Sequence, residues 1–166
     1  KKNGEFTVNI ALIEKNTPIF GVVYAPAIDL LFWGGKQLGA WRKNTQNLEE
    51  QVFVISQISK GIKIAGSRSH PSGKMKNFLS QFEEYELQPM GSSLKICLVA
   101  DGTVHFYPRL GPTMEWDTAA AHAILKSAGG EMVDIKNDLP LKYNKEELLN
   151  PEFICGKYSM IKKLQY

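Results

Sequence analysis

Four strand patterns follow one another at the start of the chain with only turns between them. Residues 6–13 alternate polar with apolar side chains, and short apolar segments at 19–24, 30–33 and 38–42 are bounded by proline or glycine. Such alternation and punctuation are typical of β-strands. Adjacent strands joined by turns predict an antiparallel meander over this part of the chain.

After residue 60 the pattern changes to strands that alternate with helices. The predicted strands lie at 62–65, 85–87, 103–107, 131–134 and 153–155, and the predicted helices at 75–84, 94–100 and 116–127. Residues 43–60 are polar and mixed, and the sequence predicts no element there. Strands followed by this alternation indicate an α+β, layered αβ fold, with a mixed sheet and helices on its faces.

The composition narrows the class of protein. An apolar share of 43% over 166 residues is enough to bury a core. The net charge of +3 comes from scattered lysines, without the basic stripe that nucleic-acid-binding proteins carry. No apolar run approaches the ~20 residues of a transmembrane helix. The composition therefore indicates a globular protein with no nucleic-acid partner and no transmembrane segment.

The two cysteines, Cys97 and Cys155, lie far apart in the sequence. Neither belongs to a motif with the spacing of metal ligands, so the sequence predicts no structural zinc site. Cys97 lies in the apolar run 96–100 and is interpreted as a small buried hydrophobic residue. A disulfide between the two stays open, and we interpret both as thiols of a reducing compartment.

The segment 116–120, Trp-Asp-Thr-Ala-Ala, begins a predicted helix and places one carboxylate in its first turn. Its alanines let the backbone lie close to a neighbouring element, so that Asp117 can hold a cation at the edge of a crevice. The alternative is that Asp117 only offsets the helix macrodipole, which contributes ~0.3–1 kcal/mol. Glu115 is expected to point to another side of the helix, because residues two apart do not share a face.

Ser67 and His70 belong to a Ser-Arg-Ser-His segment directly after the predicted strand 62–65. Open α/β sheets bind ligands at the carboxyl ends of their strands, where short polar residues leave room. The sequence therefore makes Ser67 and His70 candidates for ligand binding. The alternative is a surface turn that Pro71 ends.

Ser92 and Lys95 belong to the segment 91–95, Gly-Ser-Ser-Leu-Lys, at the start of a predicted helix with serine as its N-cap. The glycine allows a close backbone approach, and a helix N-terminus can bind an anion. Arg109, after Tyr-Pro, is suited to bidentate phosphate contact. The alternatives are a capped helix with an exposed lysine, and a solvated arginine. Together with Asp117, these residues predict half of a metal-dependent phosphate site.

The Trp-Asp-x-Ala-Ala segment, with the downstream Ala-Gly-Gly at 128–130, resembles the C-terminal signature of the lithium-sensitive, magnesium-dependent phosphatases of the inositol monophosphatase superfamily. Within that superfamily the chain is similar to the bacterial 3′(2′),5′-bisphosphate nucleotidases. The similar blocks lie at 1–13, 21–26, 67–70, 91–95 and 107–109. The resemblance implies the inositol-monophosphatase-like (sugar phosphatase) fold. In that fold the meander at 1–42 completes an N-terminal αβ part, and 43–166 form the C-terminal α/β part.

The resemblance also implies an activity. The implied reaction is removal of the 3′-phosphate of adenosine 3′,5′-bisphosphate to give AMP during sulfate assimilation, and it is supported by more than one Mg²⁺ ion. Asp117 would be a metal ligand close to the substrate. Substrate-binding positions are implied for Ser67, His70, Ser92, Lys95, Arg109 and Asp117. A cytoplasmic location is implied, while association with the inner membrane surface and formation of a homo-oligomer stay open.

Two acidic segments of the family, Gly-Asp-x-x-Glu and Asp-Pro-x-Asp-Gly-Thr, do not occur in this sequence. In the family they supply most metal ligands and position the attacking water. The family pattern places the second directly before Lys1, so we expect this sequence to be the C-terminal part of an enzyme, inactive alone. Two alternatives stay open. The first is another phosphatase of the superfamily, of the inositol monophosphatase type, acting on inositol phosphates or fructose bisphosphate. The second is a non-catalytic nucleotide-binding module.

Overall fold

The structure is a computed structural model that describes residues 4–46, 48–58, 61–66 and 72–166. Its strands are β1 (Val8–Glu14), β2 (Thr17–Ala25), β3 (Leu30–Gly35), β4 (Gly39–Lys43), β5 (Glu49–Gln51), β6 (Ile62–Gly66), β7 (Tyr85–Pro89), β8 (Tyr107–Arg109), β9 (Glu131–Asp134) and β10 (Phe153–Gly156). Its helices are α1 (Gly73–Leu79), α2 (Leu94–Ala100), α3 (Glu115–Ser127) and α4 (Tyr158–Ile161). The strands form sheets with the orders β1-β2-β3-β4-β5, β8-β10-β9 and β6-β7.

The predicted meander is confirmed: β1 to β5 pair antiparallel in chain order, and we call them the meander sheet. Lys15 and Asn16 form the β1–β2 turn with φ values of 48° and 64°, the left-handed region that tight hairpin turns need. Strand β5 lies where the sequence predicts no element. It is polar, and Glu50 pairs there with Arg42 of β4 in register and as an ion pair.

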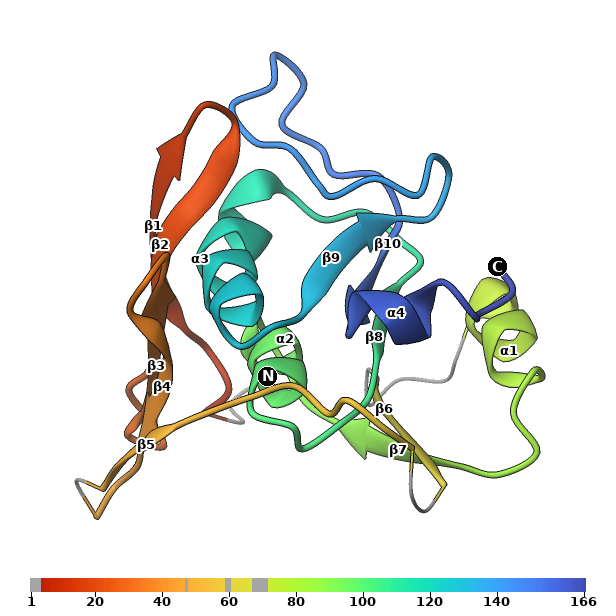
Figure 1. The fold of residues 1–166 in the computed structure, drawn as a ribbon, viewed down its shortest axis with the longest axis horizontal. Helices are drawn as coiled ribbons and strands as arrows, with labels where there is room; N and C mark the ends of the chain where they lie inside the picture. The colour runs from red at the N-terminus through yellow and green to blue at the C-terminus, as the bar shows by residue number, and fades with distance from the viewer. Residues whose placement is uncertain (1–3, 47, 59–60, 67–71) are drawn as a thin grey trace.

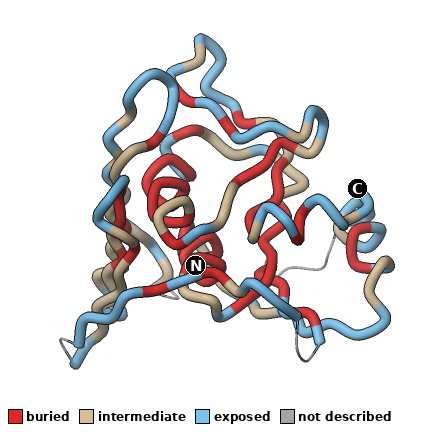
Figure 2. The backbone as a smooth tube through the Cα atoms, in the orientation of Figure 1, coloured by how far each residue is buried: buried red, intermediate tan, exposed pale blue. Residues whose placement is uncertain are grey.

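Helix α3 lies between the meander sheet and the β8-β10-β9 sheet (Figure 1). Most of its residues are buried (Figure 2). A Cβ atom on Gly21 of β2 would lie 2.1 Å from the carbonyl oxygen of Ala120, so strand and helix backbones are in direct contact. The expected close approach of the alanine segment is therefore confirmed, and it fixes where the first turn of α3 lies.

The second half of the chain confirms the alternation of strands and helices. Strands β6 and β7 pair in parallel, whereas β10 pairs antiparallel with both of its neighbours. Cys97 of α2 and Cys155 of β10 are buried free thiols, and burial raises the pKa of both well above its usual range. The interpretation of Cys97 as a small buried hydrophobic residue is confirmed.

The prediction of a strand at 103–107 is wrong, because the strand is β8 at Tyr107–Arg109. Pro108 does not end the strand but lies inside it. Proline has no N–H to donate, and it is tolerated here because β8 is an edge strand of the β8-β10-β9 sheet. The preceding residues make a turn in which Thr103 donates its N–H to the carboxylate of Asp101 at 3.0 Å.

Helix α1 is shorter than the predicted 75–84 and ends at Leu79. The side chains of Ser80 and Gln81 donate to the carbonyl oxygens of Asn77 and Phe78, at 2.8 and 2.7 Å, which completes the helix end. Phe82 still packs on Phe78, so the apolar periodicity continues beyond the helical backbone. Helix α4 is an element that the sequence does not predict.

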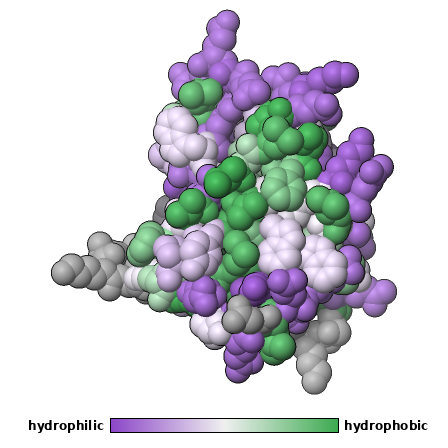
Figure 3. All heavy atoms as spheres, turned by 90° about the vertical axis from the view of Figure 1, so that its left-hand side faces the viewer, coloured by the Kyte–Doolittle hydropathy of each residue, from purple (hydrophilic) through white to green (hydrophobic). Residues whose placement is uncertain are grey.

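The outer face of the meander sheet is apolar and solvent-exposed (Figure 3). Strand β1 presents Val8, Ile10 and Leu12 there, with exposed fractions of 51%, 63% and 56%. Ile10 pairs with Val22, and that row continues across β3 to Trp33. Large contiguous apolar patches on a protein surface mark interaction sites.

Ile10→Lys is expected to reduce the fluorescence of a bound apolar dye such as anilinonaphthalene sulfonate, because the lysine places a charge between the exposed apolar side chains of Val8 and Leu12 on β1. Leu139→Lys is the control, since Leu139 is 54% exposed, close to the 63% of Ile10, but belongs to a loop outside the meander sheet. Titration of dye into each folded variant measures the effect. An unchanged signal in Ile10→Lys would show that the dye binds elsewhere.

No helix within the described part of the chain has the length and apolarity to span a membrane. The division of the chain at residue 42 stays a prediction.

Candidate functional site

A cavity of about 250 Å³ lies between β1, the start of α2, β8 and the first turn of α3. Its lining consists of Asn9, Ser92, Ser93, Lys95, Ile96, Tyr107, Arg109, Thr113, Asp117, Thr118 and Phe153. The cavity thus brings together Ser92, Lys95, Arg109 and Asp117, which the sequence predicts as site residues. Ser67 and His70 lie outside the described residues, so their roles stay predictions.

Lys95 brings a buried cation to the cavity. The side chain is only 8% exposed, and its ammonium donates to the carbonyl oxygens of Met90 and Ser92 at 3.2 and 3.0 Å. The ammonium also lies 5.4 Å from the ring centre of Tyr107. Burial and the nearby Arg109 guanidinium lower the pKa of Lys95 to about 8. The alternative of an exposed lysine is therefore wrong.

Arg109 brings a second cation to the lining of the cavity near Lys95, and we call this part of the lining the wall. One terminal nitrogen donates to the carbonyl oxygen of Pro112 at 2.6 Å. Its Nε is buried and has no hydrogen-bond partner among the described residues. Buried N–H groups are almost always paired, so this N–H favours an acceptor brought by a ligand. With Lys95 close by, the wall is suited to an anion.

The serines at the start of α2 are engaged with the N-terminal strand region. The hydroxyl of Ser93 contacts the side chain of Asn9 at 2.8 Å and that of Thr7 at 2.9 Å, while Ser92 contacts Thr7 at 2.5 Å. The prediction of serine as the N-cap residue is confirmed by Ser93, although its side chain makes no capping hydrogen bond. Ser92 has φ 51°, a strained left-handed conformation that turns its carbonyl oxygen toward Lys95.

Asp117 is in the first turn of α3 and lines the cavity. One carboxylate oxygen accepts a hydrogen bond from the backbone N–H of Met114 at 3.2 Å, so the residue also completes the helix start. The expectation that Glu115 points elsewhere is confirmed, because its carboxylate accepts from the backbone of Asn144 and Lys145.

Among the described residues, no group of three His, Cys, Asp or Glu side chains could hold a metal ion. Mg²⁺ typically retains waters and takes one or two carboxylates together with phosphate oxygens. Asp117 is exposed and lies in the same lining as Lys95 and Arg109. Its carboxylate is therefore of the kind that could serve as one such ligand. The lining of the cavity thus contains one carboxylate, Asp117, and two cationic side chains, Lys95 and Arg109.

Several lining residues are not predicted from the sequence, among them Asn9, Thr113 and Thr118. A signal existed for Asn9, because the positions of β1 that face inward are 9, 11 and 13. A polar residue on the inward side of an otherwise apolar strand usually has a specific partner. For Thr113, whose position depends on the loop before α3, we find no comparable signal in the sequence.

The chain has clear relatives among known proteins. Residues 1–164 match the model of the inositol monophosphatase family. The chain is 46% identical over 140 residues to the 3′(2′),5′-bisphosphate nucleotidase CysQ of Buchnera aphidicola, which covers 80% of this chain and 49% of that protein. It is 43% identical over 159 residues to CysQ of Escherichia coli, with 95% and 63% covered. The chain therefore spans about half to two thirds of the length of these curated relatives.

Solved structures give the same picture of the fold. The crystal structure of CysQ from Bacteroides thetaiotaomicron, a bacterial member of the inositol monophosphatase family, superposes with a TM-score of 0.85 at 37% identity and covers 93% of this chain and 64% of that one. An inositol monophosphatase from Zymomonas mobilis superposes with a TM-score of 0.73 at 21% identity, covering 93% and 58%. The second likeness bears on the fold alone.

Proposed function

The chain belongs to the inositol monophosphatase family, and we propose that it is part of a Mg²⁺-dependent phosphatase that removes the 3′-phosphate of adenosine 3′,5′-bisphosphate to give AMP. The observation that carries the proposal is the pair of cations, Lys95 and Arg109, beside Asp117 in one cavity. Further support comes from the curated relatives at 43% and 46% identity, which are bisphosphate nucleotidases.

In this proposal the residues of the cavity have separate tasks. Lys95, held by two carbonyl oxygens, places a fixed positive charge against a phosphate group. Arg109 offers the N–H of its buried Nε to a phosphate oxygen. Asp117 would hold a Mg²⁺ ion, which when bound polarises the phosphate and lowers the pKa of a bound water. Binding of a doubly phosphorylated nucleotide agrees with two cations on one wall better than binding of a single phosphate.

The cellular role follows from the substrate. Removal of adenosine 3′,5′-bisphosphate would clear an inhibitory by-product of sulfate assimilation in the cytoplasm. The partner is then a small molecule, bound together with more than one Mg²⁺ ion.

We further propose that additional polypeptide completes the site. One carboxylate is too few for a two-metal centre, and the exposed apolar outer face of the meander sheet is a surface on which a further element could pack. The partial span of the relatives' length agrees with this. We therefore expect this chain alone to release no phosphate.

The test measures phosphate release from adenosine 3′,5′-bisphosphate with Mg²⁺, with and without Li⁺, on this chain and on the complete gene product. Activity of the complete product only, abolished by Li⁺, supports the proposal. Turnover by this chain alone contradicts the need for further carboxylates. Preference for inositol 1-phosphate, or binding of nucleotide without turnover, contradicts the proposed reaction.

Lys95→Ala is expected to weaken binding of adenosine 3′,5′-bisphosphate about tenfold more than binding of AMP, because a charge-assisted hydrogen bond contributes roughly 1.5–3 kcal/mol and only one phosphate needs this cation. Calorimetric titration of both nucleotides into the wild type and the variant measures the difference. Lys63→Ala is the control, since Lys63 pairs with Glu86 at the surface. Equal losses for both nucleotides would contradict the assignment.

Binding of the bisphosphate is expected to weaken as the pH rises above about 8, the pKa of Lys95. Below that pKa the side chain is a cation, and above it the charge is lost, so affinity falls by up to about tenfold per pH unit. Titrations between pH 7 and about 9.5 avoid the ionisation of phosphate near pH 6. Lys95→Met, which has no charge to lose, should show a flat profile over the same range. A wild-type profile without this fall would be contrary evidence.

A further inference from the structure

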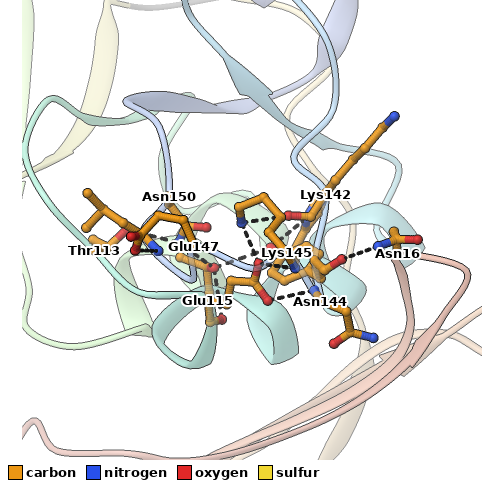
Figure 4. A network of polar contacts seen from close by, with 12 residues as sticks. Asn16, Thr113, Glu115, Lys142, Asn144, Lys145, Glu147 and Asn150 are labelled. Atoms are coloured by element: carbon orange, nitrogen blue, oxygen red, sulfur yellow. Dashed lines mark hydrogen bonds and ion pairs between the residues drawn. The ribbon is translucent and has the colours of Figure 1, made fainter.

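The segment 142–150, which we call the clamp, lies along the first turn of α3 (Figure 4). The Glu115 carboxylate accepts hydrogen bonds from the backbone N–H groups of Asn144 and Lys145 at 2.7 and 3.2 Å. The ammonium of Lys145 pairs with the same carboxylate. Glu115 is itself buried, and its carboxylate makes these hydrogen bonds and this ion pair with the clamp.

Backbone hydrogen bonds also join the later part of the clamp to the start of α3 and to the residues just before it. The N–H of Glu115 donates to the carbonyl oxygen of Leu148 at 3.0 Å, and the N–H of Asn150 donates to that of Thr113 at 2.9 Å. At its beginning the clamp is tied to the β1–β2 turn, where Tyr143 and Asn16 exchange two hydrogen bonds of 3.0 and 2.6 Å. The start of α3 is therefore connected to the meander sheet through the clamp.

The side chain of Asn150 reaches the lining of the cavity. Its amide nitrogen lies 3.1 Å from the hydroxyl oxygens of both Thr113 and Thr118 and donates to them. Both threonines line the cavity with Asp117. The hydroxyl of Thr118 in turn donates to the carbonyl oxygen of Glu115 at 3.1 Å, which fixes its orientation.

These contacts converge on Glu115 and Thr118, which lie two residues before and one residue after Asp117 in the chain. We propose that Glu115 and Asn150 are positioning residues, which hold the first turn of α3 so that Asp117 faces a bound metal ion and phosphate in the cavity. The inference rests on the proposed function. Residues that orient metal ligands without touching the metal typically change metal affinity or activity 10–100-fold when they are replaced.

Glu115→Gln tests the role of the carboxylate, because the amide can accept only one of the two backbone hydrogen bonds. In the complete gene product we expect the dissociation constant of Mg²⁺, measured by calorimetry without substrate, to rise about tenfold. Lys145→Met is the matched control: it removes the ammonium and leaves both backbone N–H groups in place. We expect that control to stay within about twofold, since partly exposed ion pairs contribute little.

A double-mutant cycle separates positioning from a general loss of stability. Glu115→Gln should lower kcat/KM about tenfold in the wild-type background and less than about twofold when Asp117 is already asparagine, because coupled residues are not additive. Equal losses in both backgrounds, or an unchanged Mg²⁺ affinity in Glu115→Gln, would overturn the inference.

Thr118→Val and Thr118→Ser decide the question if Glu115→Gln does not fold. The serine retains the hydroxyl that accepts from Asn150, so its Mg²⁺ affinity should stay at the wild-type value while that of the valine variant falls. Equal affinities for the two variants would overturn the inference. If Asp117→Asn leaves Mg²⁺ affinity unchanged, the proposed function itself fails. If only the Glu115 and Thr118 variants leave it unchanged, the positioning role alone fails.

Discussion

Asp117→Asn is expected to lower phosphate release by the complete gene product at least about 100-fold, the loss that follows removal of one preorganised electrostatic contact in an active site. The substitution removes the only carboxylate among the residues that line the described cavity. The fold should be nearly unchanged, because the asparagine carbonyl can still accept from the N–H of Met114. The lost charge in the first helical turn costs only ~0.3–1 kcal/mol of stability. Initial rates with Mg²⁺, together with the unfolding midpoint, measure both effects.

Glu152→Gln is the matched control for this variant. Glu152 is a carboxylate that pairs with Lys74 at 2.7 Å, outside the cavity. Its replacement should leave the rate within about twofold of wild type. Activity of Asp117→Asn near the wild-type rate would refute the assignment of Asp117 as a metal ligand. A large loss in Glu152→Gln would instead point to a general effect of carboxylate removal.

Much of the architecture could be predicted because local patterns determine it. The alternation in β1 places 9, 11 and 13 inward, and the turn at Lys15 and Asn16 sets the pairing with β2. The family resemblance is confirmed by the match over residues 1–164 and by the superposed CysQ structure. The inward positions of β1 and the β1–β2 turn depend on residues that are neighbours in the chain, so their periodicity and turn chemistry are visible in the sequence.

What could not be predicted depends on contacts between distant segments. In the sequence Pro108 predicts the end of a strand. Only the position of β8 at a sheet edge makes this proline acceptable inside a strand. Likewise, Asn150 meets Thr113 and Thr118 through a clamp that has no helical or strand periodicity. Single-sequence patterns carry no information on such pairings. The roles of Ser67 and His70 remain predictions.

Gly21→Ala is expected to destabilise the protein by about 3 kcal/mol, at the upper end of the range for overpacked cores. The added methyl carbon would lie 2.1 Å from the carbonyl oxygen of Ala120 and 2.8 Å from its carbonyl carbon. Both are backbone atoms, so no side chain can rotate away, and β2 and α3 must separate. For a chain of this size the unfolding midpoint should fall by about 6–12 °C.

Gly111→Ala is the control for Gly21→Ala, because a methyl group at Gly111 would meet no atom within 4 Å. Its stability should stay within about 0.5 kcal/mol of wild type. Equal midpoints for the two variants in thermal unfolding would mean that β2 and α3 are not in direct backbone contact. If the contact exists, Gly21→Ala should also displace the first turn of α3 and with it Asp117. The same glycine that allows this close contact would then determine where Asp117, the proposed metal ligand, lies, since strand and helix meet there without side chains between them.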